Sequence, residues 1–171
     1  MNHEQYMHRA IELALQVPDL PFGAVIVNRN SGEIVAEGFN QSAINPIFHG
    51  EIVAINQCAQ TNRSADWREF DLYTTAEPCS MCQSAIAWAG IDNVYYGTSI
   101  PYLQQQNWWQ INIRAVDVMA QTPFRQGRVI GGVLEAECNA LFDNSLKNKN
   151  TAAEQYQLKS AEGCNLTVTK R

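Results

Sequence analysis

The sequence predicts an α/β fold, in which helices cover a layered sheet that contains at least one parallel pair of strands. Short apolar runs rich in β-branched residues alternate along the chain with longer segments of helical periodicity. The chain has 171 residues, of which 46% are hydrophobic and 17% charged, a composition typical of one globular domain with a substantial core. We therefore expect a single domain at residues 1–146, followed by a polar C-terminal tail at 147–171.

The first elements form a helix and a hairpin. Residues 3–17 carry apolar side chains at helical spacing, and Pro18 ends the run. The apolar run at 22–27 is too short for an ordinary helix and fits a strand covered on both faces. Turn residues at 28–32 and a second strand at 33–39 complete the hairpin.

The chain then alternates between helix and strand. Asn45-Pro46 interrupts it before His49, and a helix that is apolar almost all round, and therefore expected to be buried, follows. Residues 102–109 are rich in glutamine and aromatics; they fit a short helix that lines a pocket, or exposed aromatics at a subunit contact. The other expected elements are strands at 72–75, 94–97 and 129–134, a second buried helix at 79–89 ended by Gly90, a brief helix at 114–120 and a closing helix at 135–146.

Two stretches at the starts of apolar runs supply the ligands of a catalytic metal site. They are His49-Gly50-Glu51 and Pro78-Cys79-Ser80-Met81-Cys82. Catalytic zinc typically takes three protein ligands and leaves a fourth position for water, and one imidazole with two thiolates meets this requirement. Cys79 and Cys82 lie at i and i+3, so at the start of a helix both sulfurs face one side and the exposed backbone N–H groups favour thiolate. We expect one zinc ion per chain.

Glu51 is the expected catalytic acid and base. It stands two residues after His49 and therefore points away from a ligand on the same helical turn, which leaves its carboxylate free to move protons beside the metal. Zinc lowers the pKa of a bound water to about 7 and so provides hydroxide as the nucleophile. Glu51 would then accept and return the protons of this water.

Simpler interpretations exist for each of these residues. A C-x-x-C pair is often a redox pair or half of a structural zinc site. A redox pair needs no His-x-Glu upstream, however, and a closed structural site needs a fourth ligand. The other histidines lie near the start of the chain, and the other cysteines stand alone, as expected of core or surface thiols. Asn40, at the expected end of the second strand, fits a turn asparagine and a substrate contact equally well.

Charge and cysteine content narrow the expected partners and location. The net charge of −5 argues against a nucleic-acid partner, although a local basic patch would escape this average. No apolar run approaches the roughly 20 residues that span a bilayer. Five cysteines without regular spacing and no recognisable signal peptide favour reduced thiols and a cytoplasmic protein.

The metal-site motifs resemble those of the cytidine-deaminase-like superfamily of zinc hydrolases. H-x-E followed by P-C-x-x-C is the signature of zinc-dependent nucleobase deaminases, and the resemblance extends over residues 6–142. The segments at 21–27, 36–40 and 77–89 look most like bacterial guanine deaminases. The resemblance implies a three-layer α/β/α sandwich around a central five-stranded mixed sheet, a tightly bound zinc, and a homodimer whose neighbouring subunits help to close the pocket.

The resemblance also implies roles for individual residues. His49, Cys79 and Cys82 match the zinc ligands, Glu51 matches the proton shuttle, and Asn40 matches an asparagine that hydrogen-bonds the base. Phe22, Phe48 and Trp88 are candidate walls for a planar base, with core packing favoured for Trp88, and Ala24 in the strand of Phe22 is a further candidate contact.

The expected function is hydrolytic deamination of a small heterocycle by an aminohydrolase that acts on a cyclic amidine. Guanine, which would give xanthine and ammonia, is the first candidate. Adenosine in tRNA is an alternative, and cytosine is another, because His49-Gly50-Glu51 also resembles fungal cytosine deaminase. Residues 100–124 and the end of the chain depart from the guanine deaminase pattern, which leaves the identity of the base open. A zinc-stabilised binding module without catalysis would not need Glu51.

Overall fold

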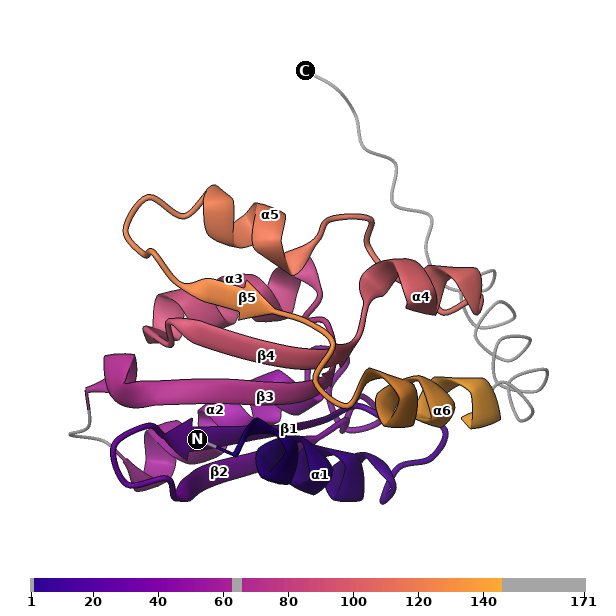
Figure 1. Ribbon diagram of the computed structural model, residues 1–171, viewed down its shortest axis with the longest axis horizontal. Helices are drawn as coiled ribbons and strands as arrows, with labels where there is room; N and C mark the ends of the chain where they lie inside the picture. Colours follow the sequence, from indigo (N-terminus) through magenta and orange to yellow (C-terminus); the bar gives the residue numbers. More distant parts are fainter. Residues whose placement is uncertain (1, 63–65, 146–171) are drawn as a thin grey trace.

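The computed structural model describes residues 2–62 and 66–145 (Figure 1). The helices and strands follow the expected alternation. In chain order they are α1 (His3–Ala14), β1 (Gly23–Asn28), β2 (Ile34–Phe39), α2 (Gly50–Thr61), a 3-10 turn (Trp67–Glu69), β3 (Phe70–Ala76), α3 (Ser80–Ala89), β4 (Asn93–Thr98), α4 (Ile100–Gln105), α5 (Ala115–Ala120), β5 (Arg128–Ile130) and α6 (Glu135–Ser145).

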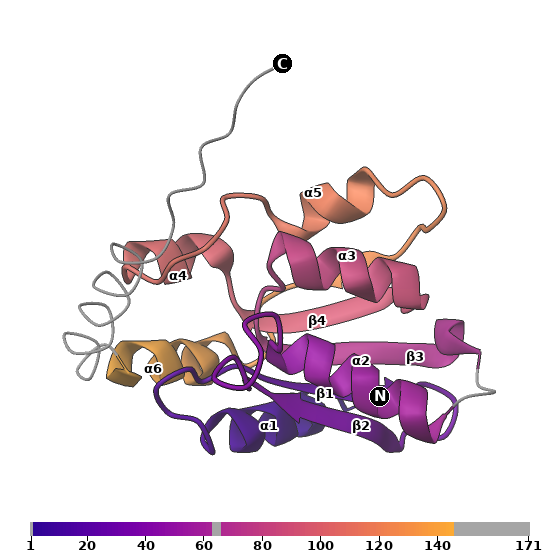
Figure 2. The ribbon, with the colours of Figure 1, turned by 180° about the vertical axis from the view of Figure 1, so that it is seen from behind.

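The five strands form one mixed sheet in the order β2-β1-β3-β4-β5. β1 runs antiparallel to both of its neighbours, whereas β3, β4 and β5 are parallel to one another. Helices α1 and α6 cover one face of the sheet (Figure 1), and α2 and α3 cover the other (Figure 2). The expected three-layer α/β/α sandwich is therefore confirmed.

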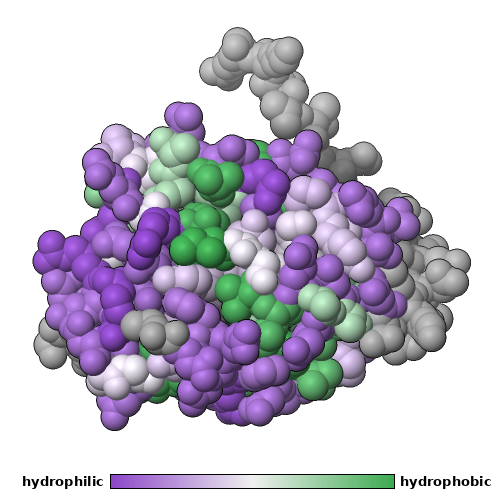
Figure 3. Space-filling view, in the orientation of Figure 1, coloured by the Kyte–Doolittle hydropathy of each residue, from purple (hydrophilic) through white to green (hydrophobic). Residues whose placement is uncertain are grey.

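The apolar core fills the space on both sides of the sheet. One cluster joins the sheet to α2 and α3 through residues such as Ile26, Leu72 and Ile86. A second joins it to α1 through Met7, Val25 and others. All seven residues of β3 are buried, as expected for a central strand covered on both faces. On the face of Figure 3, apolar surface lies mainly in the middle and hydrophilic residues surround it.

The last strand is shorter than the sequence predicts. β5 ends at Ile130, so the strand expected at 129–134 is wrong at 131–134. A Cβ atom at Gly131 would lie 2.4 Å from the ring of Tyr96, and the backbone then turns through Gly132 (φ 86°) and Leu134 (φ 50°) into α6. These left-handed conformations do not continue a strand.

Two other expectations need correction. The helix expected at 102–109 begins earlier, at Ile100, and ends at Gln105, before the two tryptophans. The two ligand helices are buried on one side only, and Trp88, for which core packing was favoured, is 76% exposed. The expected tail at 147–171 lies outside the described residues. Among the described helices, none has the combined length and hydrophobicity that spanning a bilayer requires.

Candidate metal centre

Two glycines allow the helix that carries His49 to lie directly on the sheet. His49 is the N-cap residue of α2, and Gly50 is the first residue of that helix. A Cβ atom at Gly50 would lie 2.9 Å from the Phe22 carbonyl oxygen, and one at Gly38 would lie 2.2 Å from the Gly50 carbonyl oxygen. Because neither position can hold a side chain without movement, this close packing places the start of α2 against the ends of β1 and β2.

The other two candidate ligands lie at the start of α3. Cys79 is the N-cap residue of this helix and Cys82 lies in its first turn. Cys79 Sγ lies 3.7 Å from His49 Nδ1, and Cys82 Sγ lies 3.6 Å from the same atom. Ordinary zinc–sulfur and zinc–nitrogen bond lengths at a tetrahedral angle separate sulfur from nitrogen by about 3.6 Å. The three side chains therefore fit one tetrahedral zinc ion, and their ligand atoms all lie within 4.8 Å of one another.

The thiols of the site influence each other's protonation. A hydrogen bond with Cys82, followed by one with His49, lowers the pKa of Cys79 to about 4. The hydrogen bond with Cys79 and burial raise the pKa of Cys82. A site that stabilises one thiolate beside an imidazole is prepared to bind a dication, which deprotonates a coordinating thiol outright.

Glu51 lies in the first turn of α2, beside the three ligands. It is only 5% exposed. Burial raises the pKa of its carboxyl to about 7, and the neighbouring Cys79 adds to the increase, whereas a backbone hydrogen bond and His49 act in the opposite direction. A carboxyl group with such a pKa can both accept and donate a proton near neutral pH. A bound dication would itself lower this pKa.

Asn40 is held close to the start of α2 by backbone hydrogen bonds. Its N–H donates to the Phe22 carbonyl, and the N–H of Gln41 donates to the Phe48 carbonyl at 2.8 Å. The second bond closes the loop 41–48, so that Asn40 and His49 flank a hydrogen-bonded pair of residues. The structure thus brings Asn40 to the metal-ligand side of the sheet.

The Asn40 side chain is fixed by Ser42. Both the backbone N–H of Ser42 (3.0 Å) and its hydroxyl (2.8 Å) bond to Asn40 Oδ1. A backbone N–H can only donate, so the atom that it contacts must be the amide oxygen. No partner is found for Nδ2 among the described residues, and the amide therefore presents a donor. The sequence alone did not indicate this role for Ser42.

The other candidate contacts lie in different environments. Phe22 and Phe48 are half-buried and border the loop of Asn40. Ala24 is completely buried in the core cluster beneath α2, and its role as a substrate contact stays a prediction. Trp88 lies on the outer side of α3, where its ring is 4.6 Å from that of Phe124. It is therefore not part of the buried core, and its role as a wall for the base stays a prediction.

Glu77, which precedes Pro78 and Cys79, was not predicted to have a role. Its side chain is 1% exposed and forms an ion pair with Arg114 at 2.8 Å. A buried carboxylate at the end of an apolar strand is a detectable signal, because charged residues are rarely buried without partners. The partners themselves lie 23 to 38 residues away in the chain.

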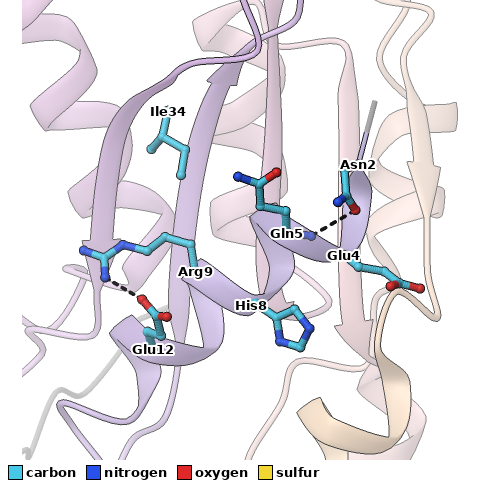
Figure 4. A pocket seen from close by; sticks show the side chains of 7 residues that line it. All are labelled: Asn2, Glu4, Gln5, His8, Arg9, Glu12 and Ile34. Atoms are coloured by element: carbon cyan, nitrogen blue, oxygen red, sulfur yellow. Dashed lines mark hydrogen bonds and ion pairs between the residues drawn. The ribbon is translucent and has the colours of Figure 1, made fainter.

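A separate depression runs along α1, away from these residues (Figure 4). It contains an exposed ion pair between Arg9 and Glu12 and the N-cap bond from Gln5 N to Asn2. None of the candidate site residues lines it. The side chains at its wall are Asn2, Glu4, Gln5, His8, Arg9, Glu12 and Ile34.

Comparisons with known proteins agree with this geometry. Residues 1–98 match a sequence-family model described as the cytidine and deoxycytidylate deaminase zinc-binding region, which identifies zinc as the metal of the site. The chain is 37% identical over 90 residues to a tRNA-specific adenosine deaminase of Rickettsia bellii, and the matched segment covers 52% of this chain and 62% of that protein. It is 39% identical over 102 residues to a guanine deaminase of Bacillus subtilis, and this match covers 56% of this chain and 64% of that protein. The matches thus span less than two thirds of these relatives.

The fold also matches solved structures. The guanine deaminase from Nitrosomonas europaea superposes with a TM-score of 0.74 at 23% sequence identity, and the match covers 84% of each chain. At this identity the likeness concerns the fold.

Proposed function

The chain belongs to the cytidine and deoxycytidylate deaminase zinc-binding family, and we propose that it is a zinc-dependent hydrolytic deaminase of a nucleobase or related small heterocycle, with guanine as the leading candidate. One observation carries this proposal. His49 Nδ1 lies at zinc-ligand separation from both Cys79 and Cys82, and the buried carboxyl of Glu51 lies beside them. A purely structural zinc site needs no such carboxyl.

The protein's own residues would handle the protons of this reaction. Zinc, when bound by the three ligands, supplies a water of lowered pKa as the nucleophile. Glu51 accepts a proton from the attacking water and delivers it to the ring nitrogen next to the attacked carbon. It then transfers the second proton of that water to the departing amino group. The carbon–nitrogen bond breaks, a carbonyl remains on the ring, and the products are the oxo base and ammonia.

Asn40 would orient the base. Because Ser42 occupies its amide oxygen, Asn40 offers Nδ2–H to the substrate. The group that it binds must therefore be an acceptor, such as a carbonyl oxygen or an unprotonated ring nitrogen, both of which guanine possesses. Phe22 and Phe48, which border the same loop, are the proposed apolar walls.

The charge of the chain supports a free base, whereas the names of several relatives support an alternative. A net charge of −5 does not favour binding to a phosphate backbone. Relatives from Rickettsia and Buchnera nevertheless bear the name tRNA-specific adenosine deaminase. Deamination of adenosine in tRNA is therefore the second candidate.

A substrate screen with two salt concentrations separates these candidates. Ammonia release would be measured with guanine, cytosine, adenine, their nucleosides and an RNA hairpin that carries an adenosine, at about 50 and about 200 mM salt. Turnover of guanine should hardly change over this range. An RNA substrate would behave differently: if the protein contacts several of its phosphates, the affinity falls by about 10³-fold or more. Glu51→Gln, purified in the same way, controls for a contaminating deaminase. Steeply salt-dependent editing of RNA without any reaction of a free base would favour the second candidate.

We also propose a homodimer and a cytoplasmic location. Exposed apolar side chains on α3, on α5 and in the chain that follows α5 form a surface that a second subunit would cover; they include Trp88, Val116 and Phe124. The thiols of Cys58 and Cys138 are free, which is typical of reducing compartments. Light scattering of wild type and of Trp88→Glu tests the dimer, since a buried carboxylate at the interface should shift the protein towards the monomer.

A further inference from the structure

Glu77 connects the ligand turn of α3 to a distant part of the chain. Its Oε2 accepts a hydrogen bond from Ile100 N (2.9 Å), and its Oε1 accepts one from Ala115 N (2.9 Å). Arg114 Nε donates to both oxygens, at 2.8 and 2.9 Å. Pro78, whose ring restricts the backbone, is all that separates Glu77 from the ligand Cys79. The carboxylate is thus fully bonded and rigidly linked to the metal site.

The two amides belong to the first residues of α4 and α5. Such N–H groups have no partner within their own helix. Because Ile100 and Ala115 both bond to one carboxylate, the two ends of the segment 100–115 are held next to each other. The segment is therefore a closed loop, comparable in length to an Ω-loop.

The middle of this loop reaches the other half of the candidate site. Trp108 is 5% exposed, and its ring packs edge-on against Phe22 at 5.6 Å between centroids. The Phe22 carbonyl accepts the backbone N–H of Asn40. The closed loop 100–115 therefore extends from the turn of Cys79 to the residues proposed to hold the base.

We propose that Glu77 and Arg114 are positioning residues that hold the closed loop 100–115 as one wall of the substrate site. Trp108 of the loop packs against the ring of Phe22. The ion pair between Glu77 and Arg114 fixes the position of the loop relative to the metal ligands. Without the guanidinium, the buried carboxylate keeps only two amide partners, and the ends of the loop separate more readily. The affinity for the base then falls although the zinc ligands stay in place. This role in substrate binding rests on the proposed deaminase function.

A matched control lies at the other end of β3, the strand that Glu77 follows. At the opposite end of β3, Asp71 pairs with Arg29 at 2.8 Å, and their side chains are 2% and 37% exposed. The values for Glu77 and Arg114 are 1% and 36%. Asp71 also accepts a hydrogen bond from Asn93, and no candidate site residue contacts this pair in the described hydrogen-bond network. Loss of either arginine therefore removes an equivalent ion pair, but only one of them fastens the loop.

Arg114→Gln and Arg29→Gln would be compared in the zinc-loaded full chain. Thermal unfolding and zinc content measure general damage, hydrogen exchange of peptides from 100–115 measures loop order, and ammonia release gives kcat and KM. Both variants should retain zinc and lose similar stability. Only in Arg114→Gln should the amide hydrogens of 100–115 exchange faster than in wild type. The KM of this variant should rise at least about tenfold, with a smaller change in kcat. Arg114→Lys, which keeps the charge, should recover part of both effects.

Two results would overturn the positioning role. One is unchanged exchange in 100–115 for Arg114→Gln, and the other is an equal rise in KM for the two glutamine variants. If Arg114→Gln does not fold, Arg114→Lys and Arg29→Lys form the same comparison. If wild type deaminates none of the bases, the proposed function fails, and the exchange experiment still decides whether Arg114 holds the loop.

Discussion

Replacing Gly38 by alanine should weaken zinc binding, because β2 and α2 meet at this position without room for a side chain. A Cβ atom there would lie 2.2 Å from the Gly50 carbonyl oxygen and 2.5 Å from Ala54 N. Ordinary van der Waals contact begins near 3.4 Å. The start of α2 must therefore move away from the sheet by about 1 Å.

This displacement is large compared with the tolerance of a metal site. Ligand distances in a zinc site are held within about 0.2 Å, and His49 is the residue that immediately precedes the displaced turn. We expect zinc affinity to fall by about 10–100-fold, the range seen when the support of a ligand is removed. Overpacking should also lower the free energy of unfolding by about 1–3 kcal/mol.

Gly23→Ala provides the matched control for this experiment. Its Cβ atom would lie 2.1 Å from the Ala10 carbonyl oxygen, in α1, which carries none of the predicted ligands. Both variants should lose similar stability in a thermal melt. Only Gly38→Ala should release its zinc to a competing chelator at a lower chelator concentration than wild type does. Wild-type zinc affinity in Gly38→Ala, or an equal loss in both variants, would refute the argument.

The remaining predictions concern single side chains of the site. Cys82→Ala should lose zinc and stability together. Cys58→Ala removes a buried thiol of α2 outside the site and should keep its zinc. Elemental analysis and thermal melting of both variants test this, and a zinc-loaded Cys82→Ala would contradict the ligand assignment. Glu51→Gln should keep zinc and fold but lose at least about 100-fold in turnover, measured by ammonia release. More than a tenth of the wild-type rate would assign the proton transfer to another residue. Ser42→Ala should raise KM about two- to tenfold with kcat nearly unchanged, because one of two hydrogen bonds that fix Asn40 is lost, and Ser42→Thr should restore it. An unchanged KM would show that the Ser42 backbone N–H suffices.

The fold and the metal ligands could be predicted from the sequence because both depend on local patterns. Apolar runs define strands such as β1 and β3, and helical spacing defines α1. The His-x-Glu and Cys-x-x-Cys spacings fix the ligands relative to helix starts. These signals extend over a few residues and do not require knowledge of distant contacts.

The features that could not be predicted depend on tertiary contacts. β5 ends where Gly131 meets the ring of Tyr96, a residue far away in the chain. Trp88 is a large apolar residue in an apolar helix, but it lies exposed on the outside of α3. Hydrophobicity alone does not distinguish a core position from an exposed apolar surface. The partners of Glu77 follow it by 23 to 38 residues, and no local pattern announces them.

The attachment of both ends of the loop 100–115 to Glu77 has a consequence for how such a protein can change. Ile100 and Ala115 remain bonded to Glu77 whatever the number of residues between them, so the length and composition of the intervening chain can vary without disturbing the anchor. Doubling the length of a flexible loop costs only about 0.6 kcal/mol in closure entropy. Changes at the mostly exposed residues 109–113 would thus reshape the surface of the loop while the buried Leu103 and Trp108, the zinc ligands and Glu51 keep their positions. New substrates would be reached by replacing one exchangeable cassette.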